Sequence, residues 1–505
     1  MIHGYNSNEP MLRRNLLLDS NHRIHFTRRG FLIFSGATLF AQAQTPSALK
    51  LARIVNSIRY DSLTPVAEKH AKMILASTLA SAAAGSSIGS VKIVRDLAKD
   101  EGGKPEATLW FDRVKLPVTA AARVNAMQSD ASASDDSDLR NVAHIGTCLT
   151  AVGLAMGERV GASGKDFLTA VVAGYEAAGR IGEALAASSD GQRNGGAISG
   201  SIGRGFHASA IVAFGGTVAA GRLLKLTDEQ LAQAISTTAT TVGGLSISTN
   251  SWAREYHAGN AALTAVNSAL AASRGYTVNP DMLESSGGFL RVFAGGTADA
   301  RALERPLKDD YQISRYLAVK LVPGAHALHP AVEAAVNAAR ESRAGPDQVA
   351  KILVAGPQSA LASSSRAPKD TIEAIHSLPY YLASAVADKD FGWKHADAVM
   401  IKRPEVVRLM GLVEQDPAPV ARRYEWGWGA TVTLVLKSGA RFSSTVDAPR
   451  GSAPRGIDWS DIDAKYQALM PQVGMDVARR NDVLRMIQAF ESVGKVGQFV
   501  SLLGR

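Results

Sequence analysis

The stretch RGFHASAIVAFGGTVAAGRLLKLTDEQLAQAIS, Arg204–Ser236, contains two helical patterns separated by a short polar break. Small and aliphatic residues run on from Ala208, and a second pattern begins at Asp228. Thr227 and Gln230 have the spacing of an N-cap residue and its N3 partner, which is the capping box that starts many helices. Helices so rich in alanine and glycine indicate a fold in which helices pack closely against one another.

The same helical texture extends over most of the 505 residues, of which 46% are apolar and 6% aromatic. A chain of this length is expected to form more than one domain. A helical region is predicted from Ser47 to about Ala126, with an interruption at 106–111 and a restart near Pro117. Further helices are expected to begin near Gly146, Lys165 and Ala258, and Ser163 with Asp166 repeats the N-cap and N3 spacing.

Two stretches between these helices are predicted to be loops. Residues 128–138, QSDASASDDSD, are too rich in Ser and Asp for a regular element. Residues 195–206, GGAISGSIGRGF, are rich in glycine but have no Walker lysine and follow no strand. We therefore interpret them as a mobile loop and not as a phosphate cradle.

Strand patterns appear after about residue 315. Residues 350–356 and 431–446 alternate or run apolar as strands do, and Ser438-Gly439 marks a hairpin turn. Helical periodicity returns over 459–503. The sequence thus predicts a mainly α fold with a smaller α/β domain, divided into residues 44–317 and 453–505 for the helical part and 318–452 for the α/β part.

The first 43 residues resemble a twin-arginine export signal. Arg28-Arg29 precede the short apolar run FLIFSGATLFA, and Ala41-Gln42-Ala43 fits a small-residue cleavage site. We expect this segment to be removed and the protein to be periplasmic or secreted. No later apolar run is long enough for a membrane span, so no membrane contact is expected after removal of the signal.

Charge and cysteine content exclude several classes of protein. The net charge is +9, but basic residues are scattered and form no stripe interleaved with aromatics, so no nucleic-acid partner is expected. Cys148 is the single cysteine, which excludes intrachain disulfides and Cys-rich zinc sites. It lies four residues after His144 among Leu, Thr and Ala, where buried packing is a better interpretation than a nucleophile.

Four histidines stand where a loop meets a predicted helix: His144, His207, His257 and His329. Helix starts expose unpaired N–H groups and the positive end of the dipole, which attract carboxylates and keep a histidine neutral. A neutral imidazole can accept a proton. His326, three residues before His329, raises the alternative of a metal site, but no carboxylate is nearby and Pro330 suits a helix start, so no metal is predicted.

Six stretches in order resemble the MmgE/PrpD family: 134–147, 204–236, 254–277, 283–296, 319–330 and 449–466. The resemblance implies a large all-helical domain built from both ends of the chain and an inserted α/β lid. It also implies a homodimer that needs no cofactor or metal and acts on a small di- or tricarboxylate. Members move a proton next to a carboxylate, which gives dehydration, decarboxylation or epimerisation.

Matched motif by motif, the resemblance implies a site in the cleft between the domains. Its catalytic residues would be His144, His207, Lys320, Asp136 and Ser137, with His144 or His207 as the base and Lys320 as proton donor or anion stabiliser. Arg254, His257, His329, His326 and helix N-termini would bind the substrate's carboxylates.

The chain departs from the family pattern at several of these positions. Arg254 replaces the usual lysine and can hold a carboxylate by a bidentate fork but cannot release a proton. Ala133 stands where the family has an aspartate, and one extra residue separates Ser137 from His144. These departures leave open an alternative function, a secreted carboxylate-binding protein of the same fold without catalysis.

Overall fold

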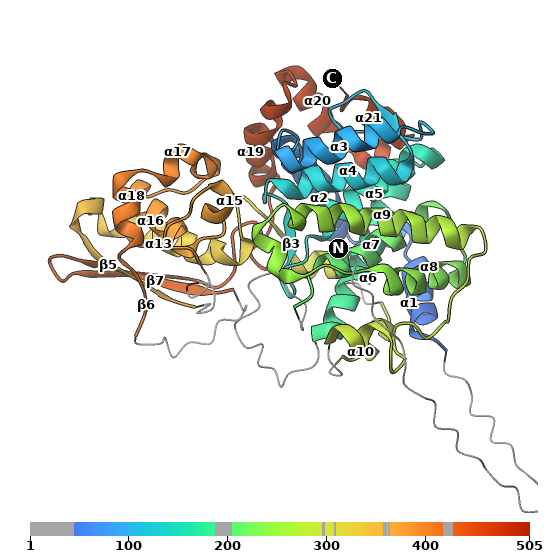
Figure 1. Cartoon of the computed structure of the whole chain (residues 1–505), viewed down its shortest axis with the longest axis horizontal. Helices are drawn as coiled ribbons and strands as arrows, with labels where there is room; N and C mark the ends of the chain where they lie inside the picture. The colour runs from blue at the N-terminus through green and yellow to red at the C-terminus, as the bar shows by residue number, and fades with distance from the viewer. Residues whose placement is uncertain are drawn as a thin grey trace, which may run out of the picture. The chain divides into compact units, whose positions relative to one another are not determined.

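A computed structural model describes residues 45–186, 205–294, 298–307, 310–356, 361, 364–417 and 428–504. The predicted export signal lies outside the described residues, as do residues 195–204 of the glycine-rich stretch. The predicted fold class is confirmed, because helices dominate and the strands are few and short. Figure 1 shows the helices of the larger part beside the smaller part that carries the main sheet.

The larger part is built from helices of both ends of the described chain. From the first end these are α1 (Ser47–Asn56), α2 (Pro65–Gly85), α3 (Gly89–Glu101), α4 (Val118–Ala131), α5 (Ile145–Val160), α6 (Gly164–Ala186), α7 (Ser209–Leu223), α8 (Asp228–Thr241), α9 (Ala253–Ser273), α10 (Phe289–Ala294), α11 (Arg301–Glu304) and α12 (Gln312–Tyr316). From the other end they are α19 (Trp459–Leu469), α20 (Val477–Gln488) and α21 (Val496–Ser501). Helix α19 packs against α2 and α21 against α5, within the same hydrophobic core.

Both predicted helix starts with capping residues are confirmed. Thr227 caps α8, with its Oγ1 accepting from the Gln230 N–H at 3.2 Å and the Gln230 side chain accepting in return at 3.1 Å. Ser163 Oγ accepts from the Asp166 N–H at 3.2 Å, directly before α6. The start of α9 was predicted five residues too late, so His257 lies inside this helix and Arg254 lies in its first turn.

Glycine explains how closely the central helices approach. A Cβ at Gly174 of α6 would lie 2.6 Å from the carbonyl oxygen of Gly215 in α7. A Cβ at Gly216 would lie 2.6 Å from the sulfur of Cys148 in α5. Cys148 is fully buried there, and burial raises the pKa of its thiol to about 12, which agrees with its interpretation as a packing residue.

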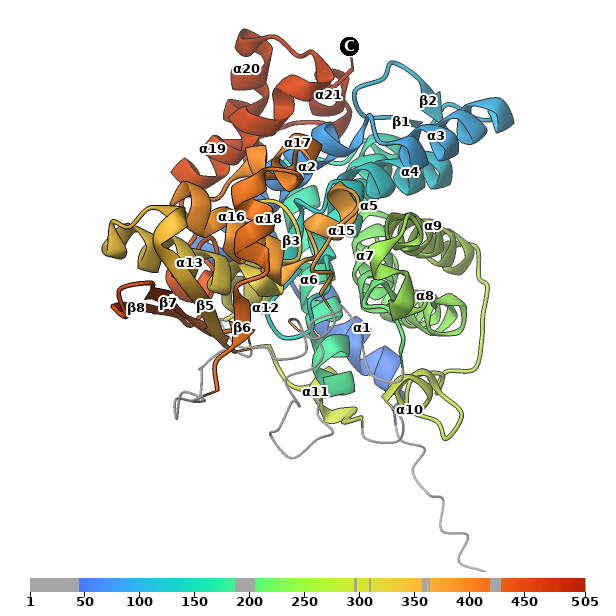
Figure 2. The ribbon, with the colours of Figure 1, turned by 60° about the vertical axis from the view of Figure 1, so that its left-hand side comes forward.

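The smaller part contains a four-stranded sheet with the order β6-β5-β7-β8. Its strands are β5 (Val349–Ala355), β6 (Val413–Gln415), β7 (Ala430–Leu436) and β8 (Arg441–Val446), and only the β5–β6 pair is parallel. The predicted hairpin joins β7 to β8, with Gly439 at a φ of 86°. Helices α13 (His329–Ser342), α16 (Leu378–Asp388) and α18 (Pro404–Met410) cover one face of this sheet and share its hydrophobic core (Figure 2).

The prediction of a loop over residues 128–138 was wrong at both ends. Helix α4 continues to Ala131, and Asp136–Asp138 form the short strand β3, which pairs with β4 (Leu317–Val319). The polar side chains of this stretch are buried, apart from Ser132, which is partly exposed. They can be buried because cationic side chains from distant parts of the chain neutralise the carboxylates.

No single helix of the described ranges is long and apolar enough to cross a membrane. Helices α2 and α3 reach that length and composition only together, and they meet at a bend of 94°.

Candidate active site

The pairing of β3 with β4 brings two charged residues together across 185 positions of sequence. Asp136 lies opposite Val319 in the antiparallel register, and the Lys320 N–H donates to the carbonyl oxygen of Asp135 at 3.1 Å. The Lys320 ammonium then donates to Asp135 Oδ1 at 2.7 Å, with both side chains almost fully buried. The backbone ladder therefore fixes this ion pair in place.

The turn after Lys320 requires a glycine. Gly324 has a φ of 97°, and a Cβ there would lie 1.5 Å from the Tyr381 hydroxyl oxygen. Its N–H donates to the carbonyl of Ala133, and the next N–H, of Ala325, donates to the carbonyl of Ile375. The turn is thus bonded to Ala133 of the larger part and to Ile375 of the smaller part.

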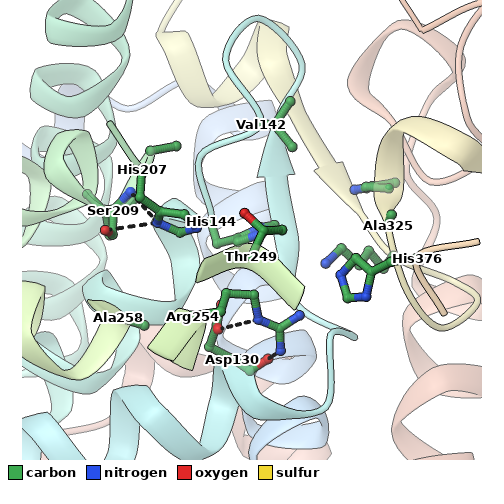
Figure 3. A pocket seen from close by; sticks show the side chains of 14 residues that line it. Asp130, Val142, His144, His207, Ser209, Thr249, Arg254, Ala258, Ala325 and His376 are labelled. Atoms are coloured by element: carbon green, nitrogen blue, oxygen red, sulfur yellow. Dashed lines mark hydrogen bonds and ion pairs between the residues drawn. The ribbon is translucent and has the colours of Figure 1, made fainter. Parts of the chain in front are cut away.

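Beside this turn lies a narrow pocket with ≈ 50 Å³ of internal space, lined also by residues of α7 and α9 and by residues at the start of α5 (Figure 3). That volume holds only a few water molecules. Five of the nine predicted site residues line it: His144, His207, Lys320, Arg254 and His326. The structure therefore brings the three groups proposed for proton transfer, two histidines and a lysine, to one cavity.

His144 occupies the N-cap position of α5 and has a fixed tautomer. Its Nδ1 lies 2.6 Å from the carbonyl oxygen of Asp136 and 3.1 Å from Asp135 Oδ2. Both oxygens only accept hydrogen bonds, so Nδ1 carries the hydrogen and Nε2 bears the lone pair. Burial lowers the pKa of His144, more than the neighbouring Asp135 raises it. The ring is therefore neutral near pH 7, and its free nitrogen can accept a proton.

His207 has the opposite tautomer. The Ser209 N–H donates to His207 Nδ1 at 3.2 Å, and the Ser209 hydroxyl lies 3.0 Å from the same atom. Because Nδ1 accepts, the hydrogen is on Nε2. Burial, helped by the charges of His144 and His257, lowers the pKa of His207 to about 3. The neutral ring therefore offers an N–H donor where His144 offers an acceptor.

Asp136 and Ser137 lie behind His144 and do not line the pocket. The Asp136 carboxyl group accepts from the Gly146 N–H at 3.0 and 2.9 Å, and so occupies the N-terminus of α5. Burial and the adjacent Asp135 raise the pKa of Asp136 to about 7. Ser137 Oγ lies 3.4 Å from His144 Nδ1. The first turn of α5, expected to receive a substrate carboxylate, is thus filled by a carboxyl group of the protein.

Arg254 is largely occupied by an internal partner. Its Nε donates to Asp130 Oδ2 at 3.1 Å, and its Nη2 donates to the carbonyls of Asp130 and Ala131 at 2.7 and 3.1 Å. The guanidinium group of Arg254, which was expected to bind a substrate carboxylate, therefore binds the C-terminal end of α4. Only Nη1 makes no hydrogen bond with the part of the chain that the structure describes.

The other three predicted histidines lie at different depths. His257 lines a neighbouring pocket, and its ring centroid lies 5.2 Å from that of His207. His326 lines the main pocket, 4.6 Å from the ring of His329, which is buried behind it. Burial lowers the pKa of His329 to about 3 and that of His326 well below its usual range. Neither ring nitrogen of His326 has a hydrogen-bond partner among the described residues.

Four residues of this region were not predicted as site residues: Asp130, Asp135, His376 and Lys465. Lys465 of α19 is fully buried and donates to Ser77 Oγ at 2.7 Å and to the carbonyl of Ser134. His376 lines the pocket from the smaller part. His376 directly precedes Ser377, the N-cap of α16, and Pro379 lies in the first turn of that helix. A proline at a helix start also follows His329, so the same signal could have indicated His376.

Ligand atoms of Asp130, Asp135 and His144 lie within 4.8 Å of one another, a spacing that a cation could use. Arg254 and Lys320 already pair with these carboxylates at 3.1 and 2.7 Å. The positive charge that such a cluster needs is therefore supplied by the protein.

Comparison with known proteins extends over most of the chain. Residues 49–301 match the MmgE/PrpD N-terminal domain, and residues 323–488 match the MmgE/PrpD C-terminal domain. Cis-aconitate decarboxylase from Homo sapiens is 22% identical over 428 residues, which cover 83% of this chain and 86% of that protein.

Proposed function

Because the chain belongs to the MmgE/PrpD family, we propose that it is a lyase or isomerase that moves a proton α to a carboxylate of a small di- or tricarboxylate. The proposal includes no cofactor and no metal. The distant similarity to a decarboxylase supports this class of reaction but does not choose among dehydration, decarboxylation and epimerisation. We further propose a homodimer that works in the periplasm or outside the cell.

The observation that carries the proposal is the arrangement of the two histidines. His144 and His207 line one pocket in opposite tautomers, one with a free lone pair and one with a free N–H. Lys320 lines the same pocket. A site that removes a proton next to a carboxylate needs a base, and it needs donors for the negative charge that then develops. These three side chains supply both.

In the proposed step, His144 Nε2 takes the proton from the carbon next to the substrate carboxylate. The imidazolium that forms lies 3.1 Å from Asp135, which stabilises its charge. The electron pair left on carbon spreads onto the carboxylate, where the Lys320 ammonium and the His207 N–H stabilise it. The free Nη1 of Arg254 is the remaining donor for a second carboxylate.

The pocket has walls from both parts of the chain. Its wall includes His326 and His376 of the lid side, whereas His144 and His207 belong to the helical part. We propose that the substrate enters when these two walls move apart.

The proposal is tested by incubating the protein with a panel of di- and tricarboxylates in D₂O and following deuterium incorporation by NMR. The wild type should exchange or convert at least one acid. His144→Ala and Lys320→Ala should fold normally and lose activity by about 10²- to 10⁴-fold. Near-wild-type turnover in both variants would refute these roles, and binding without any exchange would favour the carboxylate-binding alternative.

His395 offers a matched control for the histidine substitution. It is fully buried within the lid, where its Nε2 lies 3.0 Å from Asp388 Oδ2, and it does not line the pocket. His395→Ala should therefore lower stability while the folded fraction keeps its turnover.

A further inference from the structure

The neighbouring pocket that His257 lines lies next to the main pocket and reaches the protein surface. It has ≈ 350 Å³ of internal space, and exposed residues such as Thr241, Gly243 and Tyr256 contribute to its wall. A pocket of this size with hydroxyl and imidazole groups in its wall holds water. Among the described residues, Ser209 is the one that lines both pockets. Its side chain therefore lies between the main pocket and water that exchanges with the solvent.

Two groups of Ser209 contact the same atom of His207. The backbone N–H of Ser209 donates to His207 Nδ1 at 3.2 Å, and the Ser209 hydroxyl oxygen lies 3.0 Å from this atom (Figure 3). The backbone N–H is sufficient to keep the hydrogen of His207 on Nε2. The hydroxyl group is therefore not needed to fix the tautomer, but it carries a hydrogen that can be transferred to Nδ1.

The buried ring of His207 transfers a proton only if its two nitrogens act together. Burial, and then the charges of His144 and His257, lower the pKa of His207 to about 3, so the ring does not carry a second proton near pH 7. Loss of the Nε2 hydrogen alone would leave an anionic ring, which burial also disfavours. His207 can therefore give its Nε2 hydrogen to a substrate when Nδ1 receives a hydrogen in the same step, and the Ser209 hydroxyl is placed to supply it.

We propose that His207 and Ser209 form a proton relay between the neighbouring pocket and the substrate in the main pocket. The inference rests on the proposed function and adds the path by which its protons exchange with solvent. In the inward step, the Nε2–H bond breaks as a C–H or O–H bond forms on the substrate, and Nδ1 takes the hydrogen of the Ser209 hydroxyl. A water molecule of the neighbouring pocket gives a hydrogen to the Ser209 oxygen and becomes hydroxide.

The outward step returns every group to its starting state. The proton that His144 has taken from carbon passes through the main pocket to His207 Nε2, and Nδ1 returns its hydrogen to Ser209. Ser209 passes its own hydrogen to the hydroxide ion, which becomes water again. His144 is then neutral, and the hydrogen of His207 is back on Nε2, as in the structure. Ser209 thus acts on the substrate only through His207.

Ser209→Ala separates the transferable hydrogen from the tautomer, because it removes the hydroxyl and keeps the backbone N–H. The variant is compared with the wild type on a panel of di- and tricarboxylates that includes citrate and malate. On an acid that the wild type converts, kcat should fall by about 10²-fold or more with little change in KM, because the substrate contacts are kept. Ser209→Thr keeps a hydroxyl and should recover part of the turnover. Ser268→Ala is the control, since Ser268 of α9 is buried and lines neither pocket, and it should keep the wild-type kcat.

Turnover in mixtures of H₂O and D₂O distinguishes a relay from a structural role of the hydroxyl. In the wild type several hydrogens move in one step, so kcat should fall with the deuterium fraction along a curve, and Ser209→Ala should lose this curvature. Thermal melts establish that the variants are folded. Wild-type kcat in folded Ser209→Ala, or a lower kcat with the curve unchanged, overturns the relay. Failure of the wild type to convert any acid of the panel is a different result, which overturns the proposed function and the relay with it.

Discussion

Replacing Asp135 by asparagine tests the electrostatic centre of the site. Asp135 is fully buried and faces the Lys320 ammonium at 2.7 Å and His144 Nδ1 at 3.1 Å. These two partners hold its pKa well below its usual range, although burial alone would raise it. The asparagine keeps the size and shape but leaves Lys320 buried without a counter-charge.

Two effects of different size are expected. Breaking one side of a buried ion pair typically costs about 3 to 5 kcal/mol in the free energy of unfolding. Turnover should fall by about 10²- to 10⁴-fold, because the imidazolium formed on His144 loses the charge that stabilises it. The tautomer of His144 should persist, since the carbonyl of Asp136 still accepts from Nδ1 at 2.6 Å. Because Asp135 raises the pKa of His144, the acid limb of kcat/KM should move to lower pH.

Asp138→Asn is the matched control. Asp138, the last residue of β3, is equally buried, but its ion pair is with Arg140 at 3.4 Å, whereas that of Asp135 is with Lys320. Urea unfolding should show a loss of stability in both variants, whereas the pH profile of turnover should change only in Asp135→Asn. Wild-type stability together with wild-type turnover in that variant would refute the reasoning.

Two further predictions concern stability and pH. His207, His329 and His376 have a pKa of about 3 when folded, so these three side chains alone bind three more protons in the unfolded chain than in the native state between about pH 3 and 6.5. Asp136, with a folded pKa of about 7, offsets one of these protons above pH 4, and the lowered pKa of His326 adds to the difference. The free energy of unfolding should therefore fall by at least roughly 3 kcal/mol per pH unit on acidification from pH 6.5 to 4, and a flat profile in urea titrations would contradict the assigned burial. Burial lowers the pKa of Lys465 to about 7, so wild-type stability should rise with pH above 7, and Lys465→Met should lose this rise, worth roughly 3 kcal/mol between pH 7 and 9.5. Parallel stability curves for the two proteins would mean that Lys465 keeps its proton over that range, and would contradict its lowered pKa.

Features determined by neighbouring residues could be predicted from the sequence. The N-cap at Ser163, the capping box at Thr227 and the hairpin at Ser438-Gly439 depend on contacts within a few positions, and each lies where it was expected. The helix start after His144 is local in the same sense.

Features determined by charges that are distant in sequence could not be predicted in this way. The stretch 128–138 has the composition of a solvated loop, yet its carboxylates meet Lys320 and Arg254 from 185 and 124 positions away. For the same reason the sequence did not show which aspartate contacts the proposed catalytic groups. Asp136 was predicted, but Asp135 pairs with Lys320 and His144. The fork of Arg254 was expected to meet a substrate, but nothing local shows that Asp130 already binds it.

The pairing of β3 with β4 also affects the order in which parts of the protein fold. The Lys320 N–H, directly after β4, donates to the carbonyl of Asp135, and the Val319 N–H within β4 donates to the carbonyl of Gly451 at 2.8 Å. Three segments that are remote in sequence must therefore meet before Lys320 takes its position. Contacts of such high sequence separation form slowly, because loop closure precedes any gain in energy. After dilution from denaturant, helical circular dichroism should therefore return before ligand binding does, and recovery of the pocket should mark the end of refolding.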